Sequence, residues 1–126
     1  MDDPITLAHS LFKKECYSES LSVCKIILSK DPYHSEASYI ASRISFQMEN
    51  WKAATTFAKI CLSTDPNHIK CRAISANCKT ILGQTDEAIN DYILILKAVP
   101  NAPTMCGRLG DLLVNQNRLE DALSQF

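Results

Sequence analysis

The sequence predicts an all-α fold made of repeated helix pairs, and two observations carry this prediction. Three of the five prolines, Pro32, Pro66 and Pro100, are evenly spaced along the chain. The chain has only three glycines in 126 residues, where an average protein of this length has about nine, so few positions suit the turns of a β-rich fold. A helix-ending residue that returns at a constant interval of about 34 residues indicates a repeated unit.

The prolines divide the chain into rows 1–34, 35–68, 69–102 and a partial row 103–126. Each proline lacks a backbone N–H and pushes the preceding residue out of the α region, so each is expected to end a helix. A second break divides each row near its middle, which gives two helices per row. These breaks are expected at Glu15-Cys16, Glu49-Asn50, Gly83-Gln84 and Asn117-Arg118.

The second helix of each row has an apolar stripe at offsets of four and three residues, which keeps one side toward the core. A small residue in the stripe lets the two helices of a pair approach closely, and larger residues fill the space beside it. The stripe consists of Ser20, Cys24 and Ile27; Ala54, Ala58 and Cys61; Ala88, Tyr92 and Ile95; and Ala122 and Phe126.

These rows resemble the tetratricopeptide repeat family, whose period is about 34 residues and whose eighth position is small. That position holds Ala8, Ser42, Ala76 and Gly110. The row from Gly83 to Pro100 is close to the family pattern, and Leu109-Gly110 stands where the family has leucine and glycine. The resemblance covers the whole chain and implies a superhelix, or solenoid, of antiparallel helix pairs.

The first helices of rows two and three depart from the family pattern. Its three large positions hold Ser38, Ala41 and Ser45 in row two, and Arg72, Ser75 and Lys79 in row three. Apolar residues recur instead at Ala37, Ile40, Ile44 and Met48, and at Cys71, Ile74, Cys78 and Leu82. Both sets keep helical spacing, so we expect these helices to form but to turn a different side toward their neighbours.

The last row stops at Phe126, part of the way into its second helix. Stacked repeats bury their core by covering each neighbour, so an uncapped repeat is expected to expose Leu119, Leu123 and Phe126. Two explanations stay open. The chain is either the N-terminal portion of a longer protein or a unit that covers this edge by homo-oligomerisation.

We find no set of residues that predicts catalysis. The sequence has no nucleophile elbow, no phosphate-binding glycine loop and no H-E-x-x-H. Among the histidines, His34 and His68 occupy equivalent positions in successive rows, which the repeat explains. The six cysteines contain no C-x-x-C, so we predict no metal and no cofactor, and expect all six to pack as small apolar residues in a reducing, cytoplasmic compartment.

Charge and hydropathy exclude two further classes of partner. Thirteen basic and fourteen acidic residues leave a net charge of −1, which does not favour nucleic acid. No apolar run approaches the roughly 18 to 20 residues of a membrane-spanning helix. The expected partner is therefore a protein or a peptide.

The family resemblance implies where such a partner would bind, because first helices of these repeats line the concave face of the superhelix. Aromatic residues there would anchor apolar side chains, and cations would pair with carboxylates or a peptide C-terminus. For Tyr39 and Phe46, an alternative interpretation is that their side chains pack in the core. The expected groove residues are Ile5, His9, Phe12, Tyr39, Arg43, Phe46, Lys70, Asn77, Arg108 and Asp111.

Besides a general interaction scaffold, the resemblance leaves two narrower functions to consider: binding of a chaperone tail and service as an accessory domain of an enzyme. Family members that clamp the acidic tail of heat-shock chaperones use lysine, asparagine and arginine at defined positions, and neither reading frame of this chain keeps more than one of them. Chaperone-tail binding is therefore disfavoured. The alternative is that the repeats form an N-terminal accessory or oligomerisation domain of a larger multidomain enzyme, such as a bacterial transferase.

Overall fold

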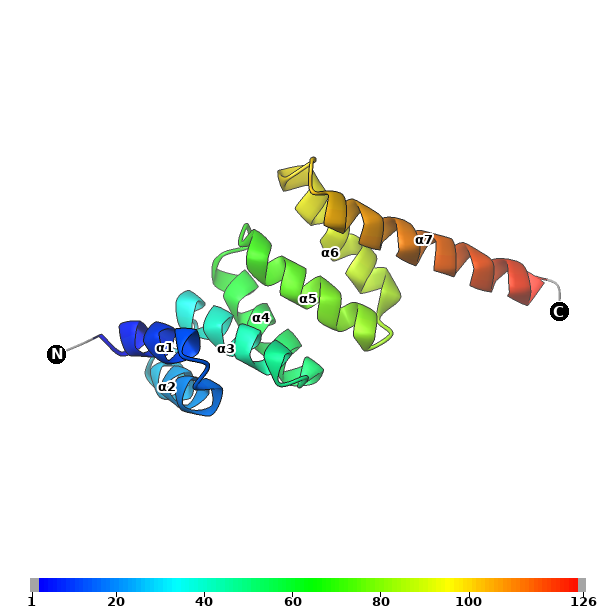
Figure 1. Ribbon diagram of the computed structural model, residues 1–126. Coiled ribbons are helices and arrows are strands. Elements are labelled where there is room, and N and C mark those ends of the chain that lie inside the picture. The colour runs from blue at the N-terminus through cyan, green and yellow to red at the C-terminus, as the bar shows by residue number, and fades with distance from the viewer. Residues whose placement is uncertain (1–2, 125–126) are drawn as a thin grey trace.

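The computed structural model describes residues 3–124, with side chains through residue 116, and this part of the chain is helical with no strand. Figure 1 shows the helices stacked in antiparallel pairs along a curved row, so the predicted all-α repeat is confirmed. None of the described helices is both long enough and apolar enough to cross a membrane. The helices are α1 (Pro4–Lys13), α2 (Tyr17–Lys30), α3 (Ser35–Gln47), α4 (Trp51–Thr64), α5 (Ile69–Ile81), α6 (Thr85–Ala98) and α7 (Pro103–Ser124).

The turns within the first three pairs share one conformation. The residue after the capping position has a positive φ each time: 62° at Glu15, 60° at Glu49 and 80° at Gly83. The next amide then donates back to the first helix, as Asn50 N does to Ser45 O at 2.8 Å. This left-handed helix ending satisfies carbonyl groups that would otherwise lack partners. The predicted breaks in rows one to three are therefore confirmed.

The histidines at equivalent positions are helix caps. The Ala37 amide donates to His34 Nδ1, and the Cys71 amide donates to His68 Nδ1, each at 3.1 Å. These amides are at the starts of α3 and α5, where backbone donors have no partner within the helix. The recurrence of histidine at this position of the repeat therefore has a structural cause.

The core depends on small residues where the two helices of a pair meet. Ala8 of α1 and Ser20 of α2 are both fully buried, and Ser20 Oγ donates to the Ala8 carbonyl oxygen at 2.8 Å. A side chain that bonds directly to the backbone of the neighbouring helix requires the two helices to lie close together. The equivalent residues of the next two pairs, Ser42, Ala54, Ala76 and Ala88, are also fully buried.

In the first helices of rows two and three, the side that carries the shifted apolar residues is packed as predicted, but the family positions are packed as well. Helix α3 packs against α1, α2, α4 and α5, so it is covered on more than one side. It buries the family positions Ser38, Ala41 and Ser45, and it also buries Ala37, Ile40 and Ile44. Small residues at the family positions therefore let α3 pack closely against neighbours on more than one side.

In α5, the polar residues at the family positions face a buried carboxylate of α6. Asp91 is 5% exposed. It accepts from Arg72 Nη1 at 3.1 Å, Ser75 Oγ at 2.9 Å and Lys79 Nζ at 3.0 Å. Arg72 Nη2 also donates to the Pro66 carbonyl oxygen at 2.9 Å. Charge-assisted hydrogen bonds therefore hold α5 on α6 where the family uses large apolar side chains.

The predicted break at Asn117-Arg118 is wrong, because α7 continues without interruption from Pro103 to Ser124. Leu119 and Leu123 belong to α7, but their side chains, and all of Phe126, lie outside the described residues.

The cysteines divide into two groups. Cys24, Cys61, Cys71 and Cys78 are buried, and burial in apolar surroundings raises the pKa of each thiol, to about 11 for Cys24. Cys106 is exposed and Cys16 is half-buried, which corrects the expectation that all six belong to the core. Cys106 lies on α7, which packs against α6 alone among the described helices.

We expect Glu49→Gly to stabilise the protein by about 0.5–1 kcal/mol, because glycine removes the cost of a positive φ at a residue with a Cβ. Gly83→Ala is the matched control. A Cβ at Gly83 would meet no atom within 4 Å, so only its φ of 80° opposes the change. We expect a loss of about 1 kcal/mol. Urea unfolding measures both, and a destabilised Glu49→Gly variant would contradict the backbone argument.

We expect Asp91→Ala to destabilise the protein by about 3 kcal/mol, because it leaves the Arg72 and Lys79 cations at a poorly solvated site without their carboxylate. The control is Asp111→Ala, an exposed carboxylate on α7 whose loss should change stability by less than about 0.5 kcal/mol. Urea unfolding again provides the measurement. Equal effects of the two substitutions would show that the Asp91 cluster contributes nothing.

Candidate functional site

The first helices of the pairs lie on the inner side of the stack. Helix α3 contacts both α1 and α5, whereas no second helix contacts another second helix in the part of the chain that the structure describes. A stack whose first helices are closer together than its second helices bends toward the first helices. Residues on the inner sides of α1, α3, α5 and α7 therefore share one concave face (Figure 1).

Three of the predicted groove residues meet around Arg43. Its guanidinium carbon lies 4.3 Å from the centre of the Phe12 ring of α1 and 5.5 Å from the centre of the Tyr39 ring. Attraction between a cation and the face of an aromatic ring holds the guanidinium in place. No carboxylate among the described side chains forms an ion pair with Arg43. Its charge therefore stays available on an exposed surface.

Tyr39 connects this cluster to the next repeat. Its ring centre lies 4.5 Å from that of His68, the residue that caps α5. Burial raises the pKa of the Tyr39 hydroxyl, and the nearby Arg43 charge partly opposes this effect. The tyrosine is therefore neutral at physiological pH and contributes an aromatic surface. We call Phe12, Tyr39, Arg43 and His68 the Arg43 cluster.

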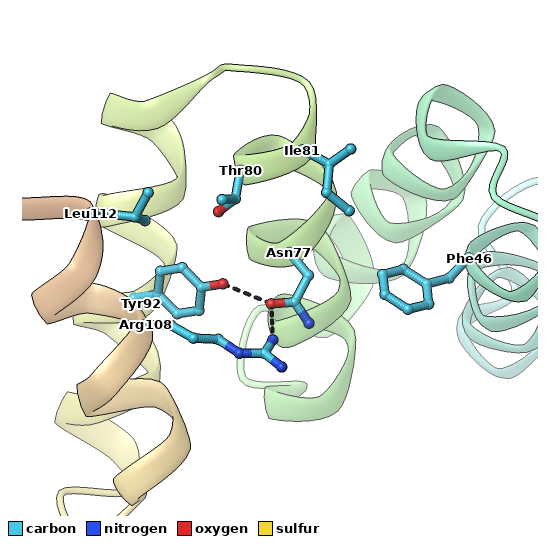
Figure 2. A pocket seen from close by; sticks show the side chains of 7 residues that line it. All are labelled: Phe46, Asn77, Thr80, Ile81, Tyr92, Arg108 and Leu112. Carbon is cyan, nitrogen blue, oxygen red and sulfur yellow. Dashed lines mark hydrogen bonds between the residues drawn. The ribbon is translucent and has the colours of Figure 1, made fainter. Parts of the chain in front are cut away.

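A pocket of about 340 Å³ opens between α5 and α7. Figure 2 shows Phe46 of α3 on one side of this pocket and Arg108 and Leu112 of α7 on the other, with Tyr92 of α6 behind them. Phe46 is held at its outer side by Trp51, whose ring centre lies 5.1 Å away. We call this hollow the α5–α7 pocket; its lining residues are Phe46, Asn77, Thr80, Ile81, Tyr92, Arg108 and Leu112.

Asn77 is the polar centre of the α5–α7 pocket. Its Oδ1 accepts from the Tyr92 hydroxyl at 2.7 Å and also from Arg108 Nη1 (Figure 2). Because the oxygen already has two donors, the orientation of the amide is fixed, and its Nδ2 group can donate to a bound molecule. The pocket therefore combines apolar walls with an oriented amide and a guanidinium.

The remaining predicted residues do not join either group. Ile5 packs against the core near α1 and α2. His9 Nε2 lies 3.5 Å from Glu36 Oε2, and both side chains are largely exposed. Lys70 and Asp111 are exposed. The structure thus brings Phe12, Tyr39 and Arg43 together in one place, and Phe46, Asn77 and Arg108 in another.

Sequence reasoning missed three lining residues: Ile81, Tyr92 and Leu112. A fourth, Thr80, lies at an inner-face position of the repeat but is not among the ten expected groove residues. Tyr92 was assigned to the core stripe of α6, and it is indeed 1% exposed. A buried tyrosine hydroxyl nevertheless needs a hydrogen-bond partner, and this requirement could have indicated a polar residue across from it. Ile81 and Leu112 have no comparable signal, because their place in the pocket depends on the angle between α5 and α7.

We expect Tyr92→Phe to destabilise the protein by about 1 kcal/mol, because it removes the hydrogen bond to Asn77 and little else. If that bond carries the effect, Asn77→Ala should cost less in the Tyr92→Phe background than in the wild type. Urea unfolding of the two single variants and the double variant measures this coupling. Purely additive effects would contradict the hydrogen bond.

Comparisons with known proteins agree with this architecture. Among curated proteins, none matches the sequence of this chain. Among solved structures, the first TPR of Spaghetti (RPAP3) bound to the HSP90 peptide SRMEEVD has a TM-score of 0.82 at 17% identity, with 90% of each chain covered. The Yersinia enterocolitica type III secretion chaperone SycD, in complex with a peptide of the translocator YopD, has a TM-score of 0.80 at 16% identity, covering 90% of this chain and 92% of that one.

A third structure is MamA from Desulfovibrio magneticus RS-1, residues 41 to the end, with a TM-score of 0.82, 17% identity and coverage of 97% of this chain and 71% of that one. At such identities these likenesses concern the fold. The model of the family described as anaphase-promoting complex, cyclosome, subunit 3 matches residues 13–92, which is more than half of the chain. Together with the seven stacked helices between residues 3 and 124, this match shows that the chain belongs to the tetratricopeptide repeat proteins of that family.

Proposed function

We propose that this chain is a non-enzymatic interaction scaffold that holds a peptide or protein segment on its concave face. The observation that carries the proposal is the α5–α7 pocket, where apolar walls surround the oriented Asn77 amide and the Arg108 guanidinium. Binding sites for protein segments combine apolar pockets with a few placed polar groups in this way. The inner helices α1, α3, α5 and α7 provide the rest of the surface.

The Arg43 cluster extends this surface toward the N-terminus. Phe46, which lines the pocket, follows Arg43 by three residues on α3, so the two lie about one helical turn apart. A guanidinium already stacked on Phe12 and Tyr39 loses little conformational freedom when it binds a carboxylate. The expected ligand therefore places an apolar side chain in the pocket and an acidic group within a few residues of it.

Related structures support the general class of ligand. The RPAP3 repeat domain is bound to an HSP90 peptide, and SycD is in complex with a YopD peptide. The family description also names a subunit of a multiprotein complex. This chain has isoleucine at positions 5, 40 and 74, where a chaperone-tail clamp needs polar side chains. We therefore propose a ligand other than a heat-shock chaperone tail.

The proposal is tested by selecting ligands from a display library of random peptides and titrating a selected peptide against variants. Selected sequences should pair an apolar residue with a nearby acidic one. Arg43→Glu and Arg108→Glu should each weaken binding by about tenfold or more, because they replace an attractive charge with a repulsive one. Mass spectrometry should recover the bound peptide chemically unchanged.

The matched control is Lys25→Glu, which reverses an exposed charge on α2, a second helix. Its affinity should stay within about twofold of the wild type, since its charge is screened over the distance to the inner face. Circular dichroism verifies equal folding of all variants. Binding that survives both inner-face reversals, or that is lost equally with Lys25→Glu, would contradict the groove.

A further inference from the structure

A second hollow lies along α4, one of the outer helices of the stack. Its volume is about 500 Å³, and it opens between α4 and the turn that joins α5 to α6. Helix α4 turns the buried residues Ala54, Ala58 and Cys61 toward the core and a different side toward this hollow. We call it the outer hollow; its lining residues are Lys52, Thr55, Thr56, Lys59, Leu82 and Gln84.

Two side chains of the outer hollow differ from their equivalents one repeat earlier. Thr55 stands at the position of Leu21, a larger residue that packs against the core of the first repeats. Gln84 stands at the position of Asn50, whose side chain accepts from the Ala53 amide at 3.3 Å and caps α4. Within the described residues, the Gln84 side chain makes no such capping bond to α6. The shorter Thr55 therefore leaves space, and the Gln84 amide group can bond to a ligand.

The outer hollow is positively charged. Lys52 and Lys59 are both exposed and lie seven residues apart on α4, so they stand on the same side of the helix about 10 Å apart. Helix α4 has no acidic residue. Among the described side chains, no carboxylate lies within ion-pair distance of either lysine. Both charges are therefore open to a ligand.

The lining between the two lysines is largely apolar. The Thr55 hydroxyl donates to the Trp51 carbonyl oxygen at 2.8 Å, and the Thr56 hydroxyl donates to the Lys52 carbonyl oxygen at 3.0 Å. With both hydroxyls bonded to the backbone, the threonine methyl groups and Leu82 contribute an apolar surface. A cation thus stands at each end of an apolar hollow.

We propose that the outer hollow binds an acidic amphipathic helix of a partner protein, at a site separate from the concave face. Two carboxylates about seven residues apart on such a helix match the spacing of Lys52 and Lys59 in either direction of the bound helix, and an apolar side chain between them enters the hollow. A helix fits here because it can lie beside α4 at the usual distance of about 8–10 Å between helix axes. Acidic residues are required by the unpaired charge of α4.

Fluorescence anisotropy with a synthetic peptide tests the charges. The probe is an alanine-rich helical peptide of about 16 residues, with two glutamates about seven positions apart and a leucine between them. All variants are made in the background of Arg43→Glu with Arg108→Glu, so that attraction to the concave face does not contribute. Lys52→Glu with Lys59→Glu should weaken binding by about tenfold or more, and a peptide with lysines in place of the glutamates should bind this variant again.

The matched control for the charges is Lys25→Glu with Lys30→Glu, which makes the same change of charge on α2. Affinity for the acidic peptide should stay within about twofold of the background. Circular dichroism verifies that all variants are equally folded.

The variant Thr55→Leu tests the space itself. It copies Leu21 of the preceding repeat, fills the outer hollow without changing any charge, and should weaken binding by about tenfold. Thr55→Ser is its control, because serine keeps the hydroxyl and adds no volume, and affinity should stay within about threefold.

Three results would overturn the proposal. The first is equal affinity with and without the two lysine reversals, or no saturable binding of the acidic peptide up to about 1 mM. The second is an unchanged affinity of Thr55→Leu. The third is equal binding of a scrambled peptide, or binding only when phosphoserine replaces the glutamates, which would assign the site to a different ligand. The reversed charges of the concave face are common to all these titrations, so their failure would leave the proposed function unaffected.

Discussion

The close approach of paired helices is the constraint on which the rest of the structure depends. Ser20 Oγ donates to the Ala8 carbonyl oxygen at 2.8 Å, a contact that a larger side chain at either position would prevent. Small buried residues return at the same positions in the next two pairs. The close packing of these small residues fixes the register within each pair, and the left-handed turn residues Glu15, Glu49 and Gly83 reverse the chain at the matching points. A constant repeat period follows from these two requirements.

Two neighbouring residues of α6 connect this packing to the candidate site. Asp91 holds α5 through Arg72, Ser75 and Lys79, and Tyr92 reaches the Asn77 amide from the adjacent position. The buried charge cluster therefore anchors the same helix that presents Asn77 to the pocket. Polar residues at positions where the family has large apolar ones contribute to the site's geometry, because they fix the position of α5 relative to α6.

The same packing rule explains why α7 differs. In the first three pairs, the second helix covers a small residue and completes the pair. In the fourth row the helix does not turn at Asn117, so the face around Gly110 has no covering helix within the described residues. The α5–α7 pocket borders this incomplete repeat through Arg108 and Leu112. The α5–α7 pocket and the exposed face around Gly110 therefore lie at the same end of the stack.

The sequence by itself determined the all-α class, the repeat period and the three inner turns, because helical periodicity reports which residues share a side. The family resemblance indicated six of the residues in the Arg43 cluster and the α5–α7 pocket, since it places inner-face positions of the repeat. Sequence reasoning missed Ile81, Tyr92 and Leu112, the Asp91 cluster and the unbroken α7. Tertiary structure alone decided these features. Each depends on which residue of a neighbouring helix lies opposite, and periodicity along one helix does not contain this information.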